Sequence, residues 1–304
     1  PMVSLSALRA MGLSRVQGYL MSCAAIFNAM LDPILIFGLW GLPRLELEGA
    51  ALATLITRAI TLLVAFYILH RRLHMLVNPL IGFKRLIQSW RAITEVGVPA
   101  MVASVIVPLA SGIVVAMVAS YGHEAVAGMG VAIRIEPLAL IVFYALSGVI
   151  GPFVGQNLGA GLFPRLFQAQ KVVTLFCLSF GLVLAAMLWL FGAVFASVFS
   201  QSEQVLPVAV AYLSLVPISY GAYGLVMSAN AAFNGLGNPL PSIAISFMRV
   251  FGLFLPLAYF GKAWFGLSGL FAAVALSNLV VGLLAYIWLR RTLRLLEQSN
   301  KIQA

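Results

Sequence analysis

The stretch Ile26-Phe-Asn-Ala-Met-Leu-Asp32-Pro-Ile-Leu-Ile-Phe37 places one carboxylate inside a strongly apolar run. A charged side chain in a lipid bilayer costs about 3 kcal/mol on insertion scales, so it usually faces the interior of a helix bundle or a water-filled cavity. Asn28 precedes Asp32 by four residues, and on a helix both side chains project from the same face. Two oxygen-bearing side chains on one face at this depth predict half of a cation or proton site.

The same apolar character extends along all 304 residues, of which 62% are hydrophobic and only 9% are charged. A soluble globular domain carries roughly 25% charged residues. Outer-membrane barrels show weak alternation over segments of about ten residues, and the long apolar runs of this chain do not follow that pattern. The sequence therefore predicts an all-α polytopic membrane protein.

Eight apolar runs reach the length of about 20 residues that a membrane-spanning helix needs. They cover residues 17–40, 49–70, 97–121, 125–156, 168–198, 206–233, 239–261 and 266–289. We expect each run to form one transmembrane helix.

Lys and Arg are concentrated in alternate segments beside these runs, at 1–16, 71–96, 157–171 and 290–301. Positively charged segments of membrane proteins lie on the cytoplasmic side. Both ends of this chain are therefore expected in the cytoplasm, with the helices in a bacterial inner (plasma) membrane. These segments also account for the net charge of +10, so nucleic acid is not an expected partner.

A weak internal repeat indicates two related halves. The segment Leu47-Glu-Gly-Ala-Ala-Leu-Ala-Thr54 resembles Leu267-Ser-Gly-Leu-Phe-Ala-Ala-Val274, and each opens a helix after an outer loop. Paired repeats are a common transporter architecture. The second half would hold six helices, so the first half would lack about four at its N-terminus. The predicted division is the last two helices of an N-terminal lobe at 1–75, a cytoplasmic interlobe linker at 76–96 and a C-terminal six-helix lobe at 97–304.

Five motifs in chain order resemble segments of the multidrug and toxic compound extrusion (MATE) family. They resemble its fifth helix, the start of its sixth, the entry to its seventh, the end of its eighth and the loop after its tenth: Phe27-Asn-Ala-Met-Leu-Asp-Pro-Ile-Leu-Ile-Phe-Gly38, Leu47-Glu-Gly-Ala-Ala-Leu-Ala-Thr-Leu-Ile-Thr-Arg58, Glu95-Val-Gly-Val-Pro99, Val154-Gly-Gln-Asn-Leu-Gly-Ala-Gly161 and Asn234-Gly-Leu-Gly-Asn-Pro239. The resemblance implies twelve helices in two six-helix lobes around a central cavity. Eight of them would be present, so the chain is identified as an N-terminally truncated member lacking about the first four helices.

The resemblance also implies a function and a site. Family members export cationic or amphipathic drugs in exchange for Na⁺ or H⁺, as secondary active antiporters. Asn28 and Asp32 match an Asn and an Asp of the family's coupling-ion site, Thr54 or Thr57 is the candidate on the next helix, and Asp32 would be the metal ligand if the ion is Na⁺. A second branch of the family carries a carboxylate pair in the C-terminal lobe. This sequence lacks that pair, which favours coupling through the N-terminal lobe.

Further charged side chains lie within the apolar runs and are candidates for an intramembrane polar network. Arg58 lies at a similar depth to Asp32, so a structural ion pair between the two is an alternative to an ion-binding site. Arg134 and Glu136 are two residues apart and point to different faces of a helix. A bridge between Glu136 and Arg249 within the second bundle is a further hypothesis. Several tyrosines are candidates to line a cavity and to contact cations: Tyr144, Tyr212, Tyr220 and Tyr223.

A lipid-linked oligosaccharide flippase of the same superfamily is the alternative function, although the chain offers few of the buried cationic residues that such a cavity needs. An enzyme is not expected, because all three His lie in linkers and no catalytic or metal-binding constellation is present in the sequence. The expected partners are small cationic or amphipathic molecules and the lipid bilayer. We expect a monomer with no cofactor other than the coupling ion.

Overall fold

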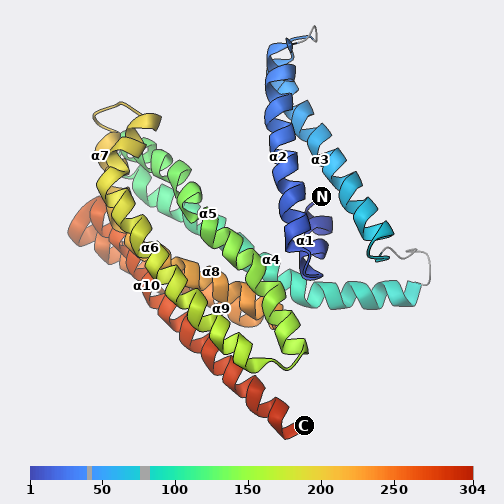
Figure 1. Ribbon diagram of the computed structural model, residues 1–304. Helices are drawn as coiled ribbons and strands as arrows, with labels where there is room; N and C mark the ends of the chain where they lie inside the picture. The colour runs from blue at the N-terminus through green and yellow to red at the C-terminus, as the bar shows by residue number, and fades with distance from the viewer. Residues whose placement is uncertain (40–42, 76–82, 304) are drawn as a thin grey trace. The chain divides into compact units, whose positions relative to one another are not determined.

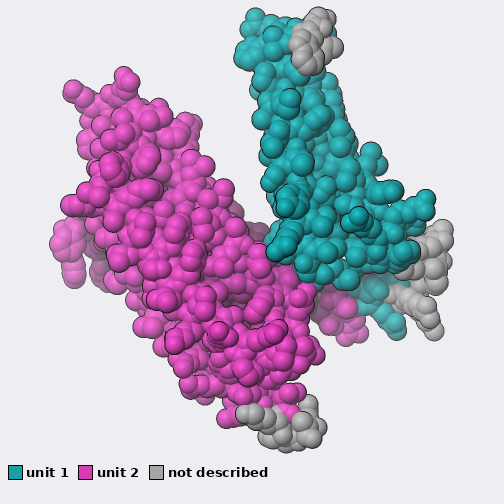
Figure 2. Space-filling model, viewed as in Figure 1, with its two compact units in different colours: residues 1–89 teal, residues 90–304 magenta. Residues whose placement is uncertain are grey.

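The computed structural model describes residues 1–39, 43–75 and 83–303, and every regular element in these ranges is a helix (Figure 1). Contacts between Cα atoms divide the chain into two compact units, residues 1–89 and 90–304 (Figure 2). The predicted all-α membrane fold is confirmed. The predicted division into two lobes and a linker stays a prediction.

Unit 1 contains α1 (Met2–Ala10), α2 (Ser14–Phe37) and α3 (Glu46–Arg71). One stripe of α3 is buried, and it consists of every fourth residue: Gly49, Ala53, Thr57, Thr61, Ala65 and Leu69. A Cβ atom at Gly49 would lie 2.5 Å from the carbonyl oxygen of Leu35. Small residues therefore let the backbones of α2 and α3 approach closely, as is usual for membrane helices.

Helix α4 (Phe83–Ala119) begins in unit 1 and continues in unit 2. It includes the second part of the predicted linker as helix, whereas 76–82 lie outside the described residues. The other elements of unit 2 are α5 (His123–Gly159), α6 (Phe163–Phe199), α7 (Leu206–Leu215), the 3₁₀ helix η2 (Val216–Ser219), α8 (Tyr220–Gly235), α9 (Leu240–Phe247), the π-helix η3 (Met248–Phe254) and α10 (Leu255–Gln303).

Helix α8 lies at the centre of unit 2, where it packs against α5, α6 and α10. Glycines make these crossings tight: a Cβ at Gly221 would lie 2.7 Å from the Cys177 carbonyl oxygen of α6, and one at Gly224 would meet the Phe143 ring of α5. The rings of Phe143 and Tyr220 are fully buried in the core between these helices. This core fixes the helices that carry the polar side chains of unit 2.

Seven stretches among the described residues are long and apolar enough to cross a membrane. The last of them, 240–300, is interrupted at Gly266, where φ is 59° and ψ is −136°. Across this break a Cβ at Gly261 would lie 2.6 Å from the Gly269 carbonyl oxygen. Residues eight apart in a continuous helix are about 12 Å apart along the axis, so the chain turns back here. The two arms together account for the last two of the eight predicted spans.

Candidate functional site

The Asn28–Asp32 pair in unit 1 forms a local polar contact on α2. Asn28 Nδ2 donates a hydrogen bond to Asp32 Oδ1 at 3.5 Å, and both side chains are half-buried. Helices α2 and α3 are antiparallel, and the contact between Leu35 and Gly49 sets their register. Asp32 therefore lies about one helical turn from that contact, near the level of Ala53.

The two candidate threonines have different surroundings. Thr57 lies on the buried stripe of α3, and its hydroxyl oxygen is buried without a hydrogen-bond partner. Thr54 is exposed, and its hydroxyl donates to the carbonyl oxygen of Ala50 in its own helix at 3.0 Å. A buried hydroxyl without a partner costs free energy, so Thr57 is the better candidate for a ligand oxygen.

Arg58 is exposed on α3 and forms no ion pair with Asp32 in the described part of unit 1. The structural ion pair considered from the sequence is therefore not seen. The Asp32 carboxylate retains the capacity to accept further bonds, because Asn28 supplies a single weak one.

A cavity of about 180 Å³ lies within unit 2 and is lined by polar side chains from six elements. Among its lining residues are Glu136 of α5, Tyr212 of α7, Tyr223 of α8, Arg249 of η3 and Asn278 of α10. An adjoining cavity of about 270 Å³ shares Tyr144, Tyr223 and Arg249 with the first, and it adds Asn230, Asn234 and Ser246. Small-molecule pockets usually have volumes of about 300–1,000 Å³, which the two cavities together reach.

Glu136 is held by a neutral partner. The Tyr212 hydroxyl donates to Glu136 Oε2 at 2.9 Å. Tyr212 is buried and packs edge-to-face on Phe271 of α10, with ring centroids 5.1 Å apart. The carboxylate is therefore fixed by a side chain whose own position is set by the core.

Arg249 also has neutral partners. Its Nη1 donates to Asn278 Oδ1 at 3.3 Å, and its Cζ lies 4.8 Å from the centre of the Tyr223 ring. Asn278 in turn donates to the Ser219 hydroxyl at 3.1 Å, which anchors it to η2. The Nε of Arg249 is buried and has no hydrogen-bond partner.

The structure brings Glu136 and Arg249 to one cavity, but no ion pair joins them among the residues that it describes. Arg134 is exposed on α5 and lines neither cavity. Of the predicted polar network, Glu136 and Arg249 thus line the same cavity, whereas Arg58 belongs to unit 1. Sequence reasoning missed Asn278, although the adjacent polar residues Ser277 and Asn278 within an apolar run were a usable signal.

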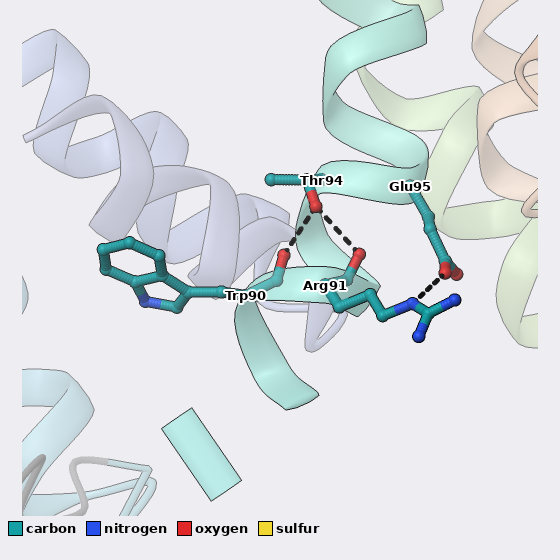
Figure 3. A network of polar contacts seen from close by, with 4 residues as sticks. All are labelled: Trp90, Arg91, Thr94 and Glu95. Carbon is teal, nitrogen blue, oxygen red and sulfur yellow. Dashed lines mark hydrogen bonds and ion pairs between the residues drawn. The ribbon is translucent and has the colours of Figure 1, made fainter. Parts of the chain in front are cut away.

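A further polar network lies at the start of unit 2 on α4 (Figure 3). Arg91 Nε donates to Glu95 Oε1 at 3.2 Å, and the Thr94 hydroxyl donates to the carbonyl oxygens of Trp90 and Arg91. The Arg91 and Glu95 side chains are 82% and 64% exposed. Such exposed pairs contribute about 0–1 kcal/mol, and this network encloses no site.

A protein-family model described as MatE matches residues 99–260, which is more than half of the chain. The chain belongs to the MATE family. This confirms the family that the sequence motifs indicated. The matched residues include Glu136, Tyr212, Tyr223 and Arg249, so most of the residues that line the unit 2 cavity lie in the matched part of the chain.

Curated relatives of this MATE chain include two bacterial membrane proteins. A FAD transporter from Shewanella oneidensis is 38% identical over 285 residues, which are 94% of this chain and 63% of the relative. The probable multidrug resistance protein YoeA from Bacillus subtilis is 27% identical over 308 residues, which cover 96% of this chain and 65% of the relative. The chain therefore spans about two thirds or slightly less of the length of these relatives.

Solved structures show the same fold. The Vibrio cholerae MATE transporter VcmN in the bent form superposes with a TM-score of 0.86 at 27% sequence identity. The match covers 96% of this chain and 65% of that one. The helical arrangement described above is thus that of a MATE transporter.

Proposed function

We propose that the protein to which this chain belongs is a secondary antiporter that exports cationic or amphipathic organic compounds in exchange for Na⁺ or H⁺. Membership of the MATE family supports transport of small molecules across a membrane. The observation that carries the exchange is Asp32, a half-buried carboxylate in a membrane helix whose one hydrogen bond in the described structure comes from Asn28. We further propose that the protein lies in the bacterial inner membrane with both ends of this chain in the cytoplasm.

Asp32 would act by exchanging a cation or proton with water. A lone carboxylate at membrane depth is costly, and binding of Na⁺ or H⁺ removes this cost. Asn28 would supply an amide oxygen and Thr57 a hydroxyl oxygen, which are hard ligands suited to Na⁺. A change of charge at this point would shift the balance between two arrangements of the helices, which is how one ligand alters the affinity for another.

The experiment is efflux from liposomes that contain the full-length protein and a fluorescent substrate, driven by an imposed Na⁺ or proton gradient. We expect Asp32→Asn to lower gradient-driven efflux to the level of protein-free liposomes, with an unchanged melting temperature. Glu203→Gln removes an exposed carboxylate and serves as the matched control with normal efflux. Undiminished efflux by Asp32→Asn would refute the role of this carboxylate.

An organic anion that carries an aromatic ring is a second candidate substrate. The 38% identical relative is a FAD transporter, so membership of the family leaves the charge of the substrate open. The specific observation in its favour is Arg249, a cation that lines both the cavity of about 180 Å³ and the cavity of about 270 Å³ in unit 2, and whose Nε is buried without a hydrogen-bond partner. Efflux of FAD from the same liposomes, driven by the same gradients, tests this candidate.

A further inference from the structure

Two side chains of opposite charge, Glu136 and Arg249, line one cavity of unit 2 without forming an ion pair among the described residues. Glu136 is bonded to the Tyr212 hydroxyl, and Arg249 is bonded to Asn278 and stacked on Tyr223. Both side chains line the same cavity, and the described residues contain no ion pair between them. The cavity therefore presents hydrogen-bond donors at one place and a carboxylate acceptor at another.

Charges that are kept apart in a low-dielectric space are costly compared with charges that are paired. The partners present satisfy only part of each group. A guanidinium has five N–H donors, of which one bonds to Asn278 while Nε is buried with no partner. A ligand that brings an anionic group to Arg249 and a donor to Glu136 would complete both sets of bonds.

The backbone around Arg249 is also unusual. Arg249 lies in η3, a π-helical segment of seven residues between α9 and α10. π-Helical turns are rare and occur frequently at functional sites. Here the turn places Arg249 where the two cavities adjoin, since this side chain lines both of them.

Aromatic side chains line the same cavities as the charges. Tyr144 and Tyr223 line both cavities, as Arg249 does. The Tyr223 ring already holds the guanidinium at 4.8 Å. Tyrosine rings pack well against flat aromatic ligands, so the shared wall suits a planar ring with polar groups on its periphery.

We propose that this cavity binds a dipolar aromatic compound, with a phosphate or carboxylate on Arg249 and a ring N–H or ammonium group on Glu136. This inference rests on the proposed export function and specifies its substrate class. It joins the amphipathic class expected from the sequence with the flavin class of the second candidate. Simple aromatic cations without an anionic group would bind less well, because they leave Arg249 without its partner.

The test compares three tricyclic probes bound to the full-length protein in detergent: FMN, which carries a phosphate, riboflavin, which has the same ring without it, and proflavine, a cation. We expect FMN to bind at least about tenfold more tightly than either of the others, since bonds between charged groups are strong. Arg249→Gln should abolish the preference of FMN over riboflavin. Arg249→Lys should restore part of it, and Arg291→Gln at an exposed site should leave it unchanged.

Glu136→Gln supplies the complementary measurement. It should weaken the binding of FMN and of riboflavin by the same factor, because both carry the same ring N–H. The ratio of their affinities should therefore stay unchanged. Equal affinity for FMN and riboflavin in the unaltered protein would overturn the proposal. The proposal would also be overturned if proflavine bound more tightly than FMN, or if Arg249→Gln lowered the affinities for FMN and riboflavin by the same factor.

Binding and transport are separable in this design. FMN selectivity that depends on Arg249, found without gradient-driven efflux, would support the cavity assignment and refute the antiport proposal. Gradient-driven efflux found without FMN selectivity would support antiport and refute the cavity assignment. The melting temperature of each variant, measured without probe, identifies any variant that fails to fold. If Arg249→Gln fails to fold, Arg249→Lys is compared with the unaltered protein, and we expect it to show a smaller preference for FMN over riboflavin; an unchanged preference would then overturn the proposal.

Discussion

Glu136 and Arg249 remain separate because each has a neutral partner that the core holds in place. Tyr212 is fixed by its packing on Phe271, and Asn278 is anchored by Ser219. A buried polar group that loses its partner pays the cost of desolvation. The partners are therefore as important to the cavity as the charges.

The substitution Tyr212→Phe tests the importance of the neutral partner of Glu136 by removing a single hydroxyl group. The variant keeps the ring and its contact with Phe271 but removes the hydroxyl that donates to Glu136 at 2.9 Å. We expect the protein to lose about 1–3 kcal/mol of stability, because a buried acceptor then lacks its donor. The measurement is thermal unfolding in detergent, with Tyr19→Phe at a 73% exposed site as control. A midpoint equal to that of the control would contradict the assignment.

At the residue scale, the sequence predicted contacts within one helix better than contacts between helices. Asn28 and Asp32 are one turn apart, so helical periodicity alone places them together. The bond from Arg249 to Asn278 joins residues 29 apart, and the chain must turn back at Gly266 for it to form. No local pattern specifies such a contact, although Arg249 itself stood out as a charge in an apolar run.

At the element scale, Gly266 decides how residues 240–303 are arranged. Its φ of 59° and ψ of −136° lie in a region that is nearly restricted to glycine. The turn brings the backbones of Gly261 and Gly269 together. It thereby lets Arg249 of η3 and Asn278 of α10 meet across two antiparallel arms.

Gly266→Ala should therefore destabilise the protein by about 1–3 kcal/mol, through backbone strain. Gly130→Ala is the matched control, because Gly130 lies within α5 and its added Cβ would meet nothing within 4 Å. The unfolding midpoints of the two variants give the comparison. An effect at Gly266 no larger than that at Gly130 would show that the turn does not require glycine.

The spans themselves were predictable because a bilayer sets a minimum length for an apolar helix. The predicted runs 239–261 and 266–289 correspond to the two arms on either side of Gly266. The π-helical turn of η3 and the 3₁₀ turn of η2 were not predicted. Both turns pack against α10, η3 also against α9 and η2 also against α6, so they depend on packing rather than on a sequence period.

At the scale of the whole molecule, the chain carries two different polar sites in its two units. Unit 1 has a carboxylate with an amide neighbour, and unit 2 has a cavity with separated charges. Five family motifs in order predicted the MATE fold, which the family match confirms. The role of each site stays a proposal, since the chain spans about two thirds or less of its relatives' length.

Antiport requires that binding of the coupling ion weakens binding of the substrate. This linkage is reciprocal, so the substrate weakens binding of the ion by the same factor. The most direct measurement is the affinity of the full-length protein for its tightest-binding probe, with and without saturating Na⁺ or acidification. We predict that the coupling ion weakens binding by at least about fivefold, and that Asp32→Asn removes this dependence while it still binds the probe. An Asp32→Asn variant whose affinity still responds to the ion as fully as the unaltered protein would contradict ion coupling at Asp32.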